Sequence, residues 1–177
     1  KAVFDGETLT VSASLCVQFS LCAGMELDEE AFSALKAAVA KEAARERAVR
    51  ILTASAVSER ELEKRLLQKG MLPSDAADAV AWLKEHRFLD DAATAAQLVD
   101  SAVRKGYGRA RVKNILYEKG IPKDLWDEAL ARIPAMDDAI DRFLAAKLRG
   151  RTADEKTIKK TIDALLRRGF SYGEIRD

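Results

Sequence analysis

The chain has 177 residues, of which 48% are hydrophobic, 33% are charged and only 6% are aromatic. That balance is typical of amphipathic helices, and no apolar run approaches the roughly 18 residues that a membrane-spanning helix needs. The formal net charge of +1 excludes the overall basicity of a histone-like DNA-binding protein.

Charge is nevertheless unevenly distributed along the chain. Residues 1–40 carry two basic and six acidic side chains, whereas residues 104–120 carry six basic side chains and one acidic side chain. The second segment therefore predicts a local basic patch, and the expected partner of such a patch is an acidic molecule.

The first 30 residues differ in character from the remainder of the chain. The Asp5-Gly6 pair lies between two short β-prone runs, which predicts a small N-terminal β-hairpin. Residues 15–21 alternate as a strand would, yet Ser14 could equally cap a short helix, and the pattern leaves both structures open. Asp28 and the two glutamates after it mark the start of a long helix over about residues 29–53.

Three later segments share one helix ending, in which a cation, a glycine and an apolar residue follow each other. The endings are Lys69-Gly70-Met71, Lys119-Gly120-Ile121 and Arg168-Gly169-Phe170, with the glycines 50 and 49 residues apart. Glycine tolerates the left-handed conformation that closes a helix, and the cation faces the negative end of the helix dipole. A leucine lies four residues before each glycine, so we predict three copies of one helical unit.

The helix starts are repeated as well. Residues 58–61 form a capping box, Pro73 opens the following helix, and Asp90-Asp91 and Asp137-Asp138 place acids in a first helical turn. Further capping boxes are expected at residues 152–155 and 171–174. We therefore predict a mainly α fold of tandem three-helix repeats. The predicted divisions are 1–40 for the hairpin and lead-in, 41–88 for the first repeat, 89–136 for the second, and 137–177 for a third that is incomplete at its C-terminus.

Two cationic segments supply the candidate binding residues. In the first, Gly106 and Gly108 keep the backbone open at a helix start, where arginine side chains and backbone N–H groups could hold phosphate or carboxylate. The second crowds lysines onto one helix face, which is unfavourable unless a partner neutralises them. An ordinary solvated surface is the alternative for both. The candidate partner-binding residues are Arg104, Lys105, Tyr107, Arg109, Arg111, Lys113, Arg149, Arg151, Lys156, Lys159, Lys160 and Arg167.

The residue patterns of an enzyme are missing from the sequence. It contains no nucleophile beside a base, no phosphate-binding glycine loop and no clustered metal ligands, so no catalytic residue, cofactor or metal is expected. Cys16 and Cys22 lack metal-ligand spacing, and we expect buried, reduced thiols in a cytoplasmic protein. Trp82 and Trp126 are expected in helix cores, and His86 at a helix cap or the surface.

Taken together, these motifs resemble the RecX family of regulatory proteins, which modulate the bacterial RecA recombinase. The resemblance covers about residues 45–177, with the motifs in the right order and at the right spacing, while the first 40 residues match more loosely. It is carried by Ser58-Glu59-Arg60-Glu61-Leu62, Lys69-Gly70, Phe88-Leu89-Asp90-Asp91, Gly106-Tyr107-Gly108, Glu118-Lys119-Gly120-Ile121 and Leu166-Arg167-Arg168-Gly169-Phe170.

The resemblance implies an elongated, curved array of three-helix units that lies in the groove of a RecA–single-stranded DNA filament. Such proteins oppose filament growth and suppress ATP hydrolysis and strand exchange, and no cofactor or metal is implied. The incomplete third repeat departs from the family pattern. We expect a monomer, with single-stranded DNA as a further, weak partner. Two alternatives stay open: a helical-repeat module that acts directly on nucleic acid, and a scaffold for another acidic protein.

Overall fold

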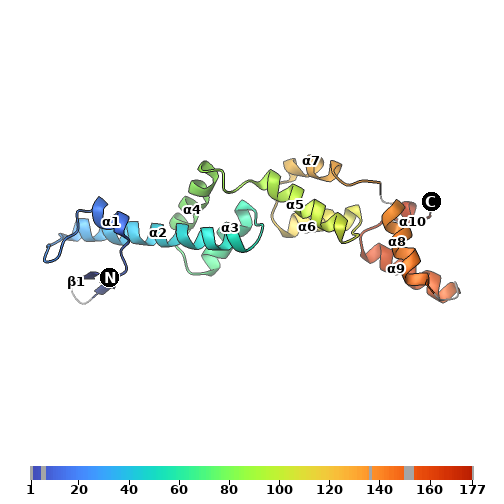
Figure 1. The fold of residues 1–177 in the computed structure, drawn as a ribbon, viewed down its shortest axis with the longest axis horizontal. Coiled ribbons are helices and arrows are strands. Elements are labelled where there is room, and N and C mark those ends of the chain that lie inside the picture. Colours follow the sequence, from blue (N-terminus) through green and yellow to red (C-terminus); the bar gives the residue numbers. More distant parts are fainter. Residues whose placement is uncertain (1, 5–6, 136, 150–153, 177) are drawn as a thin grey trace. The chain divides into compact units, whose positions relative to one another are not determined.

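The computed structural model describes residues 2–4, 7–135, 137–149 and 154–176, and most of them are helical (Figure 1). The chain divides into two compact units, one of residues 1–55 with 62–89 and the other of residues 56–61 with 90–177. The elements in chain order are β1 (Ala2–Phe4), β2 (Glu7–Leu9), α1 (Ala13–Gln18), α2 (Glu29–Ala54), α3 (Glu59–Gln68), α4 (Pro73–Glu85), α5 (Asp91–Arg104), α6 (Arg109–Glu118), the 3-10 helix η1 (Lys123–Leu125), α7 (Trp126–Ala131), α8 (Asp137–Leu148), α9 (Glu155–Arg167) and α10 (Tyr172–Arg176). The predicted mainly α fold is confirmed.

The first unit begins with the two strands of the predicted hairpin and a short helix; the Asp5-Gly6 pair expected to turn between the strands lies outside the described residues. β1 and β2 pair antiparallel, with Ala2 opposite Leu9. Of the two structures that residues 15–21 permit, the helix forms, as α1. Its cap is Ser12, whose hydroxyl accepts from the Leu15 N–H at 3.2 Å, and not Ser14, which donates to Glu42. The buried Leu15 lies three residues after Ser12, so capping and burial select the same helical register.

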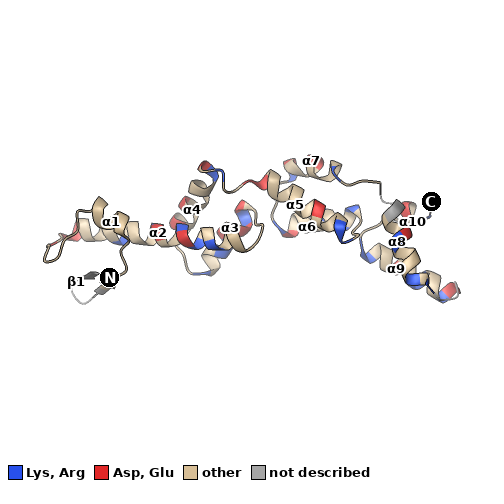
Figure 2. Ribbon diagram, in the orientation of Figure 1, with Lys and Arg blue, Asp and Glu red and all other residues tan. Residues whose placement is uncertain are grey.

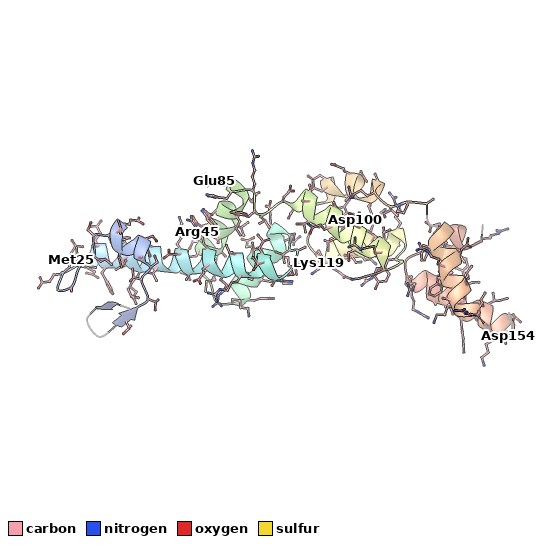
Figure 3. The ribbon with its side chains drawn as sticks, in the orientation of Figure 1. Met25, Arg45, Glu85, Asp100, Lys119 and Asp154 are labelled. Atoms are coloured by element: carbon pink, nitrogen blue, oxygen red, sulfur yellow. The ribbon has the colours of Figure 1, made fainter. Side chains whose placement is uncertain are left out.

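α2 is the expected long helix and packs against α4. Small buried side chains on both helices allow their backbones to approach closely; they are Ala44 and Ala48 in α2 and Ala76 and Ala79 in α4. An ionic cluster lies at the same interface, where Asp78 of α4 pairs with Lys41 and Arg45 of α2. Arg45 is labelled in Figure 3. Burial raises the pKa of Asp78, but hydrogen bonds and charges from the two cations outweigh it and hold the pKa below the usual 3.8.

The aromatic side chains of α4 lie at the edge of this interface rather than in the centre of a core. Trp82 is half-buried, with the Arg45 guanidinium 5.3 Å from its ring centroid. His86 is the C-cap of α4, and its Nδ1 lies 2.8 Å from the carbonyl oxygen of Trp82. The predicted cap role of His86 is therefore confirmed.

The second unit contains two small helical cores. The first lies between α5, α6 and α7, where Val99, Val112 and Leu116 are fully buried. Trp126 packs against it and donates its indole N–H to the Ile121 carbonyl oxygen at 3.0 Å, which agrees with the core role predicted for it. The second core is made by Ile140, Leu165 and Phe170, with Ile175 of α10 packed against it.

The helix ends are mostly as predicted. Gly70, Gly120 and Gly169 have φ values of +81°, +71° and +90°, the left-handed conformation that closes each helix. Ser171 and Glu174 form the expected reciprocal capping box. The box expected at residues 152–155 is wrong: α9 begins at Glu155, and its cap is Asp154 (Figure 3), which accepts from the Thr157 N–H at 3.1 Å. Thr152 and Ala153 lie outside the described residues.

The expectation of buried thiols is also wrong. Cys16 is half-buried and Cys22 is exposed, and both are free. Cys16 directly follows Leu15 on α1, so the helical turn that directs Leu15 inward points Cys16 to the side, and Cys22 lies beyond the end of α1 at Gln18. The residue divisions of the repeats and the curvature of the array stay predictions.

Candidate partner-binding surface

The outward face of α6 carries a row of exposed side chains. Arg109, Lys113 and Tyr117 are spaced four residues apart, so they project from one side of the helix at intervals of about 6 Å along its axis. Val112 and Leu116 are buried and lie on the neighbouring face, roughly 80° around the helix axis from these three residues. Tyr117 is 72% exposed although it is a large aromatic residue, and the prediction missed it. Its spacing from Lys113 was a signal that could have found it. We call these three residues the α6 row.

A second group of exposed cations lies on α9. Lys156, Lys160 and Arg167 fall within one sector of the helix, opposite the buried Thr161 and Leu165. Lys159 lies beside this sector, and all four cations are exposed. None of the four forms an ion pair with another described residue. The pKa of Asp154 is lowered mainly by hydrogen bonds from Thr157, and the charge of Lys160 makes the smallest contribution to that lowering. We call these four residues the α9 group; Figure 2 shows the basic residues along α6 and α9.

The remaining predicted residues fall into different surroundings. Arg104, Lys105 and Arg149 are exposed, and Arg151 lies outside the described residues. Tyr107 is half-buried and packs against the core of α5–α7, so the expectation that it is displayed to a partner is wrong. Its large apolar ring gains more from packing against that core than from full exposure to water.

Arg111 is engaged within its own helix. Its Nη1 lies 3.2 Å from Glu118 Oε1, seven residues further along the chain. Arg104 also has an acid near it, Asp100, whose pKa is lowered by a hydrogen bond from Arg132 and by the charges of Arg132 and Arg104. These acids reduce the positive charge that the two arginines offer to a partner, so we give the α6 row more weight than Arg104 or Arg111.

The glycine-rich loop before α6 does not present its backbone N–H groups to solvent. The Gly108 N–H donates to the Arg168 carbonyl oxygen at 2.8 Å, and the Ala110 N–H donates to the Gly169 carbonyl oxygen at 3.1 Å. The expectation that these N–H groups hold an anion is therefore wrong. The physical reason is that the carbonyl oxygens ending α9 already occupy the positive end of the α6 dipole.

The two glycines at this contact allow main chain to touch main chain. A Cβ added to Gly108 would lie 2.3 Å from the Gly169 carbonyl oxygen, and one added to Gly169 would lie 2.3 Å from the Arg111 nitrogen. Neither position therefore has room for a side chain. We call this contact between the start of α6 and the end of α9 the α6–α9 joint.

The preceding repeat uses a looser version of the same joint. The Ser58 hydroxyl, at the start of α3, donates to the carbonyl oxygen of Lys119, at the end of α6. Lys119 Nζ also lies 3.2 Å from Glu61 Oε1. A Cβ on Gly120 would lie 3.3 Å from Arg60 side-chain atoms, which is tight but leaves room for adjustment. At this looser joint the donor to the helix-ending carbonyl oxygen is the Ser58 hydroxyl, whereas in the α6–α9 joint it is the backbone N–H of Gly108.

Two further features are absent from the described part of the chain. Its histidine, cysteine and acidic side chains form no cluster that could hold a metal ion. None of its helices is both long enough and apolar enough to cross a membrane.

Comparison with known proteins places these features in a family. A model described as the first three-helix domain of RecX matches residues 44–83, and one described as the second matches residues 90–130. A protein of Cronobacter sakazakii named Regulatory protein RecX is 34% identical over 146 residues, covering 74% of this chain and 87% of the relative. A protein of the same name from Escherichia coli (strain SMS-3-5) is 33% identical, covering 75% and 87%.

Solved structures show the same fold. A crystal structure of a regulatory protein RecX superposes with a TM-score of 0.77 at 23% identity, covering 98% of this chain and 90% of the other. The crystal structure of RecX from Lactobacillus salivarius superposes with a TM-score of 0.67 at 19% identity, covering 78% and 94%.

Proposed function

The chain belongs to the RecX family of regulatory proteins, and from that premise we propose that it binds RecA filaments on single-stranded DNA and lowers their activity. The observation that carries the proposal is the family membership, with 87% of a 34%-identical RecX protein covered. On this proposal the chain acts as a cytoplasmic monomer without a cofactor, and it reduces ATP hydrolysis, filament growth and strand exchange.

The α6 row and the α9 group are the proposed contact surface. They present exposed cations, none of which is paired within the described residues, and a RecA–DNA filament offers phosphates and acidic side chains. Single contacts of this kind are screened by salt, so the affinity arises from several contacts made together.

The test is inhibition of RecA ATP hydrolysis on single-stranded DNA. Lys113→Glu should raise the concentration for half-inhibition by on the order of 10-fold, since it replaces an attraction by a repulsion. Lys123→Glu is the matched control, because it reverses an exposed cation of the same repeat outside the α6 row, and it should change that concentration less than about 2-fold. If the chain leaves RecA turnover unchanged at saturating concentration, the proposal is wrong.

Direct binding of single-stranded nucleic acid is the second candidate, and Tyr117 is the observation that favours it. An exposed ring in line with two cations offers one stacking surface beside two phosphate contacts. Affinity for an oligothymidylate should then fall with salt at a log–log slope of roughly −0.7 per phosphate contacted. Binding of this DNA at concentrations below those that inhibit RecA would favour the second candidate over the first.

A further inference from the structure

The Arg168 side chain closes a helix other than its own. Its Nη1 donates to the carbonyl oxygens of Lys105 and Gly106 at 3.1 and 3.4 Å, at the C-terminal end of α5. Its guanidinium carbon lies 4.8 Å from the ring centroid of Phe143, on α8. The sequence suggests that this cation compensates the dipole of α9, but the structure places it against the carbonyl end of α5.

Arg168 therefore joins elements of two repeats. It reaches α5 through its guanidinium, contacts α8 through Phe143, and receives the Gly108 N–H at its own carbonyl oxygen. Together with the main-chain contact of Gly108 and Gly169, these interactions allow the α6–α9 joint very little freedom of orientation. Lys119, at the equivalent position of the second repeat, makes instead an ion pair with Glu61.

The joint has a consequence for binding, because it connects the two cationic surfaces. The α6 row and the α9 group belong to one compact unit, and the joint lies between their helices. Two weak surfaces held in a fixed relation bind a common partner more tightly than two that move independently, since less orientational freedom is lost on binding.

We propose that Arg168 is a positioning residue whose guanidinium locks α9 against α5, so that the α6 row and the α9 group bind the RecA filament as one rigid surface. The identity of the binding partner rests on the proposed function. The structural part, in which Arg168 holds α9 against α5, rests on the contacts of Arg168 alone.

The first experiment measures the lock without any partner. In a chain with Cys16→Ser and Cys22→Ser, spin labels are attached at Asn114→Cys on α6 and Ala146→Cys on α8, both exposed and outside the proposed contact surface. The distance distribution between the labels should be narrow with Arg168 present and at least twice as wide in Arg168→Ala. Arg168→Lys should be intermediate, because an ammonium group keeps the charge at the end of α5 but loses the planar fork.

The second experiment measures the consequence for binding. Lys156→Ala/Lys160→Ala should raise the half-inhibiting concentration for RecA by about 10-fold with Arg168 present and by less than 2-fold in Arg168→Ala. Arg176→Ala, which removes another exposed arginine of the third repeat, is the matched control and should leave the 10-fold effect intact. If Arg168→Ala merely destabilised the fold, replacing the two lysines would raise the half-inhibiting concentration by the same factor with Arg168 and with Arg168→Ala.

The outcomes separate the lock from the function. If the distance distribution between the labels is equally wide with Arg168 and with Arg168→Ala, Arg168 does not hold α9 in place. If replacing the two lysines raises the half-inhibiting concentration by the same factor with Arg168 and with Arg168→Ala, the two surfaces do not bind as one rigid unit. If the wild-type chain fails to inhibit RecA while Arg168→Ala still widens the distances, the proposed function fails and the lock stands. Should Arg168→Ala unfold the third repeat, Arg168→Gln, which keeps one donor without the charge, supplies the same comparison.

Discussion

The substitution Gly108→Ala tests the α6–α9 joint more cleanly than any other single change. Gly108 has φ −74° and ψ 167°, an extended conformation that alanine adopts without strain. Its added Cβ would nevertheless lie 2.3 Å from the Gly169 carbonyl oxygen and 2.5 Å from the Phe170 nitrogen. Both obstacles are main-chain atoms, so the methyl group fits only if α9 moves away from α6.

The expected cost follows from the contacts that such a movement breaks. Two main-chain hydrogen bonds join the helices, at 2.8 and 3.1 Å, and each contributes about 1 kcal/mol to stability. The buried Phe170 loses part of its packing, which adds about 1 kcal/mol more. We therefore expect Gly108→Ala to lower the free energy of unfolding by about 2–4 kcal/mol. Without the joint, the change at this helix start would cost no more than about 1 kcal/mol.

The assay is urea unfolding followed by circular dichroism at 222 nm. Gly70→Ala is the matched control, because Gly70 has φ +81° with no described atom within 4 Å of the added Cβ; it should lose only about 1–2 kcal/mol from backbone strain. Gly169→Ala combines both penalties and should be the least stable of the three. If Gly108→Ala is as stable as the wild type, the close approach of α6 and α9 is refuted.

Three further changes test other contacts. Ser58→Ala should cost about 2 kcal/mol in the same urea assay, because it removes the cap of α3 and leaves the Lys119 carbonyl oxygen without its hydroxyl donor; a loss below about 0.5 kcal/mol would contradict this. Arg87→Gly should stabilise the chain by about 0.5–1 kcal/mol in thermal unfolding, since Arg87 closes α4 at φ +58°, where glycine is unstrained. A lower melting temperature of the variant would show that the Arg87 side chain stabilises the fold by more than its backbone strain costs. Asp78→Asn should cost about 1 kcal/mol at pH 7. Because the folded pKa of Asp78 lies below 3.8, its contribution is fully present above that value and is lost as the pH falls through the folded pKa, so wild type and variant should converge in acid; a difference that persists there would contradict the ionic origin.

In the two cationic segments, the sequence alone predicts some side-chain exposures and fails to predict others. Exposure of Arg109, Lys113 and the α9 group follows from helical spacing, which is a local property. The engagement of Arg111 by Glu118 depends on side-chain rotamers, which spacing does not determine. Tyr107 and Tyr117 are both aromatic residues near cations, and only packing decides that the first joins a core and the second is exposed.

The sequence by itself determined the repeat period, the left-handed glycines that close α3, α6 and α9, most helix starts and the family, because these depend on residues close together in the chain. Only the tertiary structure decided what lies against each helix end. A glycine that permits a left-handed turn and one that permits main-chain contact look alike in a sequence. Likewise, either an anion or the carbonyl end of another helix can accept from the free N–H groups of a helix start. In α6 a segment some sixty residues away along the chain supplies the acceptors.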